Sequence, residues 1–173
     1  YAVPIVFLAT AGLLDAVYLS ISHFRVYTDM GYKSFCAVSK ALNCDTVSQS
    51  PYSIFMDIPV PVWGVIGYLS FLFVLLAALR QSRKTEHLWG LLFFLSLIFS
   101  ICSVILGVIS AYRIQSYCIM CIVSFAVCFL LLFYTWLICR RFISKNLLEC
   151  LNSDFKYLLS NKRMSLAFVL FFG

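Results

Sequence analysis

Charged residues are scarce in this chain of 173 residues, and their share of 12% is about half that of an ordinary soluble domain. Hydrophobic residues make up 63%, and a chain this short could not bury so much apolar surface in one water-soluble core. The composition therefore excludes a soluble enzyme, a disordered tail and a nucleic-acid-binding module. The sequence also lacks a glycine-rich phosphate loop, a Ser-His-Asp pattern and internal repeats. An all-α membrane protein remains, with room for four or five membrane-spanning helices.

Four apolar stretches are long enough to cross a membrane as helices. They run from about residue 2 to 22, from 60 to 79, from 88 to 112 and from 118 to 139. A fifth apolar stretch begins near residue 164 and reaches the last residue, 173. We therefore expect a transmembrane four-helix bundle in residues 1–140, a cytoplasmic linker in 141–163 and the start of a fifth span in 164–173.

The loops between these stretches differ in positive charge. Segments 80–87 and 140–163 together hold nine Lys and Arg residues, whereas segments 23–59 and 113–117 hold four. Loops rich in Lys and Arg stay on the cytoplasmic side. The long loop 23–59 and the short turn 113–117 are therefore expected to face outward, to the periplasm or the lumen. His23, at the outer end of the first span, is expected to extend its ring to the interface.

Cysteines gather on this outward side. Cys36 and Cys44 lie in the long outer loop, and Cys118 and Cys121 form a C-x-x-C where the fourth span begins. The other four cysteines fall in spans or on the inner side, where we expect packing residues or reduced thiols: Cys102, Cys128, Cys139 and Cys150.

The position of the C-x-x-C favours thiol chemistry. The free N–H groups at a helix N-terminus stabilise negative charge, so a cysteine there has a lowered pKa and more of the reactive thiolate. One cysteine pair is in water and the other is at membrane depth. Two such pairs in series can exchange through mixed disulfides and link an aqueous reductant to a lipid-soluble oxidant.

Three other interpretations of these cysteines stay open at this point. The C-x-x-C could be a packing pair, because free cysteine behaves as a small hydrophobic residue. Cys36 and Cys44 could form a disulfide that only stabilises the loop. A structural zinc site is disfavoured, because its usual four cysteines form two close pairs and this loop pair is widely spaced.

Three segments together resemble the vitamin K epoxide reductase (VKOR) family, including its bacterial members that oxidise disulfide-forming proteins. The segments are CDTVSQS at 44–50, preceded by the loop cysteine Cys36, then IPVPVWG at 58–64 and CIMC at 118–121. The resemblance covers roughly residues 8–139. The order of four cysteines on this arrangement of spans carries it.

The resemblance implies a role for each cysteine. Cys36 and Cys44 would be a shuttle pair, and Cys118 and Cys121 the active-site pair. Cys44 would exchange with Cys118, which leaves Cys121 to react with a quinone. Ser50 matches a family serine near the active site.

The resemblance also implies a quinone pocket and one departure from the animal enzymes. The segment from residue 48 toward Phe55 would cap the pocket, and Trp63 and Tyr68 would either line it or belong to an interface belt. Animal enzymes have a tyrosine four residues after the last active cysteine, which hydrogen-bonds the vitamin K head group. Here that position is Phe125, which cannot donate a hydrogen bond.

We therefore expect a thiol oxidoreductase of a bacterial inner membrane whose site faces the periplasm. It would reoxidise a thioredoxin-like thiol protein or fused domain, which could follow the fifth span, and would reduce ubiquinone or menaquinone without metal or flavin. The alternatives are a vitamin K epoxide reductase of the ER membrane, facing the lumen, and a non-catalytic membrane adaptor with a structural loop disulfide.

Asp15 is the remaining candidate, because it lies inside the first span. At 1.5 Å per residue it is about 10 Å below the outer end of that span. An acidic residue at this depth is costly and is a functional candidate by default. It could form an interhelical hydrogen bond, or it could donate a proton near the quinone.

Overall fold

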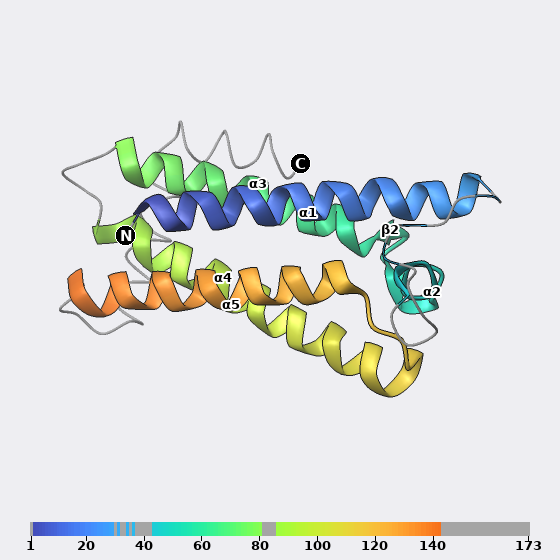
Figure 1. Cartoon of the computed structure of the whole chain (residues 1–173). Helices are drawn as coiled ribbons and strands as arrows, with labels where there is room; N and C mark the ends of the chain where they lie inside the picture. The colour runs from blue at the N-terminus through green and yellow to red at the C-terminus, as the bar shows by residue number, and fades with distance from the viewer. Residues whose placement is uncertain are drawn as a thin grey trace.

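The structure is a computed structural model that describes residues 2–29, 31, 34, 36, 43–80 and 86–142. The expected linker beyond residue 142 and the expected fifth span lie outside these residues. Four long helices form the described part (Figure 1). They are α1 (Ala2–Thr28), α3 (Val60–Arg80), α4 (Glu86–Ile109) and α5 (Ile119–Phe142).

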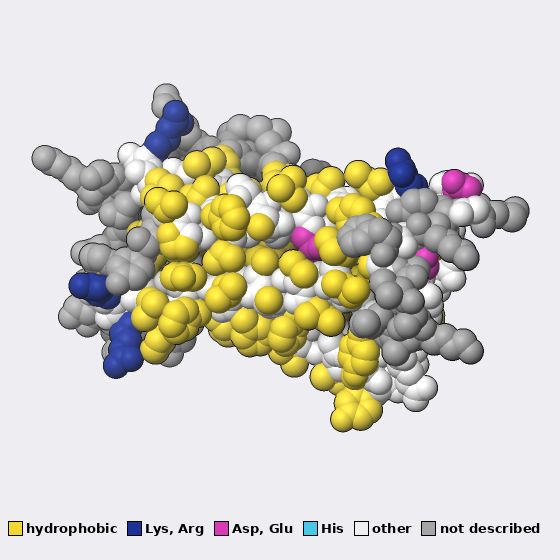
Figure 2. Space-filling view, in the orientation of Figure 1, with side chains coloured by type: hydrophobic (Ala, Val, Ile, Leu, Met, Phe, Trp, Pro, Cys, Tyr) yellow, Lys and Arg dark blue, Asp and Glu magenta, His cyan; other side chains and the backbone are white. Residues whose placement is uncertain are grey.

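Each of the four helices is long and apolar enough to cross a membrane. They alternate in direction, so α1 and α3 meet at one end of the bundle and α4 and α5 meet at the same end (Figure 1). A band of apolar side chains covers the middle of the molecule, and Lys and Arg side chains lie at its ends (Figure 2). The prediction of an all-α membrane protein with a transmembrane four-helix bundle is confirmed.

The helix boundaries differ from the expected ones mainly in α1. This helix continues to Thr28, whereas the first span was expected to end at residue 22. Polar residues mark the edge of the membrane but do not stop a helix, so the outer loop begins later than residue 23. His23 lies in this extension, and its ring is buried, with 3% exposed, against Tyr27 at 5.1 Å between ring centroids. The expectation that His23 reaches the interface is wrong.

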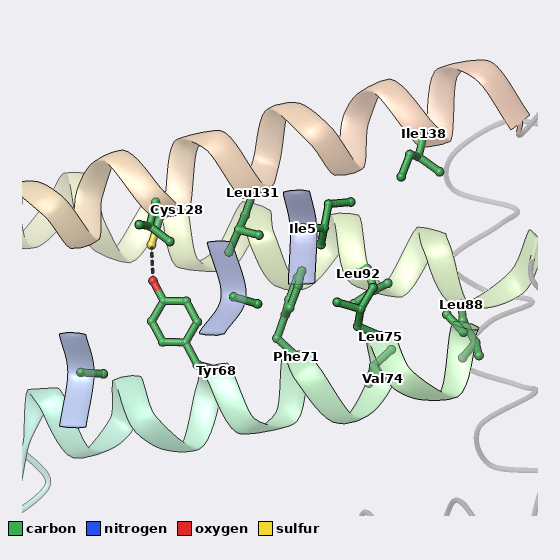
Figure 3. Packing of buried hydrophobic residues seen from close by; sticks show 14 residues of the cluster. Ile5, Tyr68, Phe71, Val74, Leu75, Leu88, Leu92, Cys128, Leu131 and Ile138 are labelled. Carbon is green, nitrogen blue, oxygen red and sulfur yellow. Dashed lines mark hydrogen bonds between the residues drawn. The ribbon is translucent and has the colours of Figure 1, made fainter. Parts of the chain in front are cut away.

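The core of the bundle contains aliphatic and aromatic side chains from all four long helices (Figure 3). Fully buried members include Ile5, Phe71, Leu75, Leu92 and Leu131. Much of the remaining apolar surface of the helices points outward, as it does when lipid replaces water as the solvent.

Polar contacts also join the helices. The hydroxyl groups of Ser96 on α4 and Thr135 on α5 lie 2.9 Å apart. The Tyr68 hydroxyl on α3 lies 3.3 Å from the Cys128 sulfur on α5 (Figure 3). Tyr68 is therefore a buried residue between helices, which excludes the interface belt, one of the two alternatives expected for it.

Short elements close the outer end of the bundle. Between α1 and α3 lie the helix α2 (Cys44–Ser48), the 3₁₀ turn η1 (Pro51–Ser53) and a small antiparallel hairpin of β1 (Ile54–Phe55) and β2 (Ile58–Pro59). The two turn residues of the hairpin, Met56 and Asp57, both have positive φ, as a tight two-residue hairpin requires. A π-helical turn, η2 (Ser110–Ile114), follows α4.

Candidate active site

Three cysteine sulfurs meet at the outer end of the bundle. Cys36 and Cys44 form a disulfide, and the sulfurs of Cys36, Cys44 and Cys118 lie within 4.8 Å of one another. All three side chains are buried, and Leu19 and Val47 pack against them. The loop disulfide and the first cysteine of the C-x-x-C are therefore close enough to react, although they are far apart in the sequence. Asn43, just before Cys44, and Ser116, two residues before Cys118, are 73 positions apart.

Two hydrogen bonds between the residues just before the cysteines hold Cys44 beside Cys118. The Asn43 N–H donates to the Tyr117 carbonyl at 3.0 Å, and the Ser116 hydroxyl donates to the Asn43 carbonyl at 3.4 Å. The segment before Cys44 is therefore bonded on both its donor and its acceptor to the segment before Cys118. This pairing fixes the register of the two cysteines.

The side chain of Asn43 also caps the helix that begins with Cys44. Its Oδ1 accepts hydrogen bonds from the N–H groups of Asp45 at 3.0 Å and Thr46 at 3.3 Å. Asparagine is among the best residues at this position because it satisfies N–H groups that have no partner within the helix. The Asp45 carboxylate in turn accepts a bond from the Ser34 N–H at 3.2 Å, which ties the segment before Cys36 to α2.

Hydrogen bonds within the turn between α4 and α5 fix the position of Cys118. The Ser110 hydroxyl donates to the Ser116 carbonyl at 2.6 Å, and the Gln115 N–H donates to the Ser110 carbonyl at 2.9 Å. Gln115 has a φ of 55°, a left-handed conformation that reverses the chain within a few residues. Cys118 then comes one residue before the first turn of α5.

The two cysteines of the C-x-x-C differ in their surroundings. Cys118 is buried and accepts a hydrogen bond from the Cys121 N–H at 3.3 Å, whereas Cys121 is exposed on the outside of α5. The span itself begins at Ile119, so Cys118 lies just outside it. Hydrogen bonding with the Cys121 side chain is the largest influence and lowers the pKa of the Cys118 thiol, while burial opposes it. Cys118 is thus the better thiolate, which suits exchange with Cys44.

The residues expected to bind a quinone form two groups. At the hairpin, the Trp63 Nε1–H donates to the Phe55 carbonyl at 3.2 Å, and the two rings lie edge to face with centroids 6.4 Å apart. On α5, Phe125 lies one turn after Cys121 and packs on Phe129 at 4.6 Å between centroids. No ring contact joins the two groups in the described part of the chain.

Ser50 is the fourth residue expected to lie at the quinone site, and in the structure its hydrogen bonds are to α2 and to the turn that follows it. Its hydroxyl donates to the Val47 carbonyl at 2.8 Å, and its own carbonyl accepts from the Ser53 hydroxyl at 2.7 Å. The Ser53 hydroxyl also donates to the Ser48 carbonyl at 2.6 Å. These bonds shape the turn that follows α2.

The surroundings of Cys121 fit an apolar quinone arriving from the lipid. Its neighbours Ile122 and Val123 are exposed apolar side chains, and Phe125 lies on the same side of α5 as Cys121. Gly107 of α4 faces the Phe125 ring, and a Cβ at this position would lie in ordinary contact with it at 3.9 Å. A thiol that opens onto such a surface can meet a lipid-soluble electron acceptor without passing through water.

Several site residues were not found from the sequence. Asn43 carried a usable signal, because asparagine before a short helix is a common cap. Ser116 and Tyr117 carried none, since their contacts depend on a long-range pairing with Asn43. The four cysteines were found, and the structure brings Cys36, Cys44 and Cys118 together.

The model of the vitamin K epoxide reductase family matches residues 3–136, which is well over half of the chain. A chain with four apolar spans and this group of cysteines is a membrane thiol oxidoreductase by class. It belongs to the vitamin K epoxide reductase family. A comparison with curated proteins found no match.

Proposed function

We propose that this protein oxidises a thioredoxin-like thiol protein and passes the electron pair through two cysteine pairs to a membrane quinone. The observation that carries the proposal is the contact of the Cys36–Cys44 disulfide with the Cys118 sulfur within 4.8 Å. A disulfide that only stabilised a loop would not need a free, buried cysteine with a lowered pKa beside it.

The first step takes place at the outer end of the bundle, where the partner must reach Cys36, which is buried in the structure. A thiolate of the partner attacks Cys36, so the Cys36–Cys44 bond breaks and Cys44 leaves as a thiolate. The second thiol of the partner then attacks the mixed disulfide. The partner leaves oxidised, and Cys36 and Cys44 hold its two electrons.

The second step moves the electrons inward. The Cys44 thiolate attacks Cys118 in an oxidised Cys118–Cys121 pair and releases the Cys121 thiolate. Cys36 then attacks Cys44, which restores the Cys36–Cys44 disulfide and releases Cys118.

The last step reduces the quinone. The active-site pair returns to a disulfide as the quinone takes up two electrons and two protons and becomes a quinol. Phe125, Phe55 and Trp63 supply apolar contacts for the ring and tail of the quinone, and Ser50 holds the turn over the site. Phe125 offers no hydrogen-bond donor, which favours a quinone over an epoxide as the substrate.

The proposed setting is a bacterial inner membrane with the cysteines at the periplasmic face. The support is the distribution of Lys and Arg, nine in the loops of one side and four in those of the other. An oxidising compartment is also where such disulfides persist.

The test uses the purified protein in lipid nanodiscs with a reduced thioredoxin-like oxidase and a short-chain ubiquinone. Quinol formation and partner oxidation are expected in equal amounts. Cys121→Ala should abolish quinol formation. Cys102→Ala, a matched control on the exposed surface of α4, should leave it unchanged. Quinol formation by Cys121→Ala at the normal rate would contradict the proposal, and equal turnover of vitamin K epoxide would favour the animal type of reaction.

A further inference from the structure

We infer that Asp15 is the proton donor for quinone reduction, and that it supplies one of the two protons that the quinol receives. The inference rests on the proposed function. It assigns a task to a carboxyl group that the transfer between the cysteines does not use.

Asp15 is buried in α1 and has no ordinary partner. Its side chain is 6% exposed, and neither carboxyl oxygen has a hydrogen-bond partner within the described part of the chain. Ser124 of α5 interacts with the carboxyl group, but no Ser124 hydrogen bond satisfies either oxygen. A structural carboxyl group inside a membrane would be expected to have paired, because an unsatisfied polar group in hydrocarbon is costly.

The groups around Asp15 place it at the redox pair. Leu19, one turn after Asp15 on α1, packs on the sulfur cluster of Cys36, Cys44 and Cys118. The carboxyl group is close enough for its charge to act on Cys118, Cys121 and Tyr68. Ser124 follows Cys121 by three residues, so the two lie about one helical turn apart on the same side of α5. Asp15 thus faces the first turns of α5, where Cys121 opens toward the lipid.

The ring of Tyr68 lies on the side of Asp15 that faces the interior of the bundle. Its hydroxyl is engaged with the Cys128 sulfur, and its ring occupies the space that a side chain at position 12 would need, so Gly12 makes room for it. Gly12 is one turn before Asp15 on α1. The ring of Tyr68 therefore packs against α1 one turn before Asp15. No described cationic side chain pairs with the carboxyl group.

The step balances in atoms and charge. Before it, Cys118 is a thiolate, Cys121 a thiol and Asp15 a carboxylic acid. The two sulfurs form a disulfide and give two electrons to the quinone, which takes one proton from Cys121 and one from Asp15. The products are the disulfide, the quinol and an Asp15 carboxylate, so the net charge of minus one is unchanged. The carboxylate regains its proton from the outer solution before the next turnover.

The experiment compares Asp15→Asn, Asp15→Glu and wild type in lipid nanodiscs, again with a short-chain ubiquinone. Asp15→Asn keeps the size and polarity of the side chain but has no acidic proton. It should slow quinol formation on the order of 100-fold, the usual contribution of general acid catalysis. It should exchange disulfides with the partner at the normal rate. Asp15→Glu should restore much of the quinol formation.

The pH profile separates a proton donor from a structural residue. Wild-type quinol formation should fall at high pH as Asp15 loses its proton. In Asp15→Asn this fall should be absent, and the remaining activity should decline only at the higher pH where the Cys121 thiol loses its own proton. Ser20→Ala is the matched control, because it removes a polar group of α1 whose hydroxyl donates to the Ala16 carbonyl of the same helix. It should behave as wild type.

Each outcome is distinct. Asp15→Asn with normal quinol formation, or with a descending limb at the same pH as in wild type, would overturn the role of Asp15 while the proposed function stands. Loss of both partner exchange and quinol formation in Asp15→Asn and Asp15→Glu alike would make Asp15 structural and also overturn it. Absence of quinol formation in the wild type would instead refute the proposed function.

Discussion

Removal of the Asn43 side chain should slow electron transfer between the two cysteine pairs. The Oδ1 of Asn43 caps two N–H groups of α2, and α2 begins with Cys44. A helix of five residues is marginal by itself, so loss of the cap reduces the population in which Cys44 is held beside Cys118. The variant Asn43→Ala leaves the backbone bonds to residues 116 and 117 in place and removes only the cap.

The magnitude follows from the cost of an N-cap. Replacing asparagine by alanine at this position costs roughly 0.5–2 kcal/mol. If the whole cost falls on the positioned arrangement, transfer slows by roughly 2- to 30-fold. Asn43→Asp is the matched control, because aspartate caps as well as asparagine and should retain near-normal transfer.

The assay follows a single turnover. The protein is prepared with Cys118–Cys121 oxidised and is mixed with reduced partner. The reaction is stopped at intervals with a thiol-alkylating reagent, and mass spectrometry counts the modified cysteines of each pair. The reasoning is refuted if Asn43→Ala transfers electrons as fast as wild type, or if Asn43→Asp is slowed as much as Asn43→Ala.

Three further predictions concern the site and the bundle. In Cys121→Ala, loss of the side-chain hydrogen bond should raise the pKa of Cys118, so its alkylation should need a higher pH than in wild type; an unchanged pH profile would contradict this. Ser116→Ala removes the hydroxyl that donates to the Asn43 carbonyl, and it should slow transfer a few-fold in the same single-turnover assay. Ser110→Ala removes the hydroxyl that holds the Ser116 carbonyl, and it should slow transfer by the same route. The double variant should therefore be no slower than the slower single variant, and additive effects would contradict this. Gly12→Leu should displace the Tyr68 ring and destabilise the bundle by roughly 1–3 kcal/mol in thermal unfolding, whereas Val17→Leu on the exposed face should not.

The four spans could be predicted because each is a long apolar run, and lipid demands such runs. The inward face of each helix could not be predicted. Residues that contact lipid and residues that contact other helices are both apolar, so no periodicity separates Phe71, which is fully buried, from Phe73, which is 44% exposed. For the same reason the sequence left the place of Tyr68 open between a buried position and an interface belt.

The candidate site was predictable where chemistry alone marks a residue. Cys36, Cys44, Cys118 and Cys121 stand out because thiols on an oxidising face have a specific chemistry. Their spatial order depends on the pairing of Asn43 with residues 116 and 117, which no local pattern encodes. The carboxyl group of Asp15 was visible inside an apolar run of the sequence. That neither of its oxygens has a hydrogen-bond partner among the described residues could be learned only from the packing of the helices.

The most direct test of the sulfur relay is a disulfide-trapping measurement in intact membranes. In the double variant Cys36→Ala/Cys121→Ala, Cys44 and Cys118 lose their usual partners while their segments stay bonded through Asn43. Mild oxidation followed by peptide mapping should find Cys44 joined to Cys118 in most molecules. Cys44 left reduced, or joined instead to a cysteine such as Cys102, would mean that the two pairs do not meet and that electrons cannot pass between them.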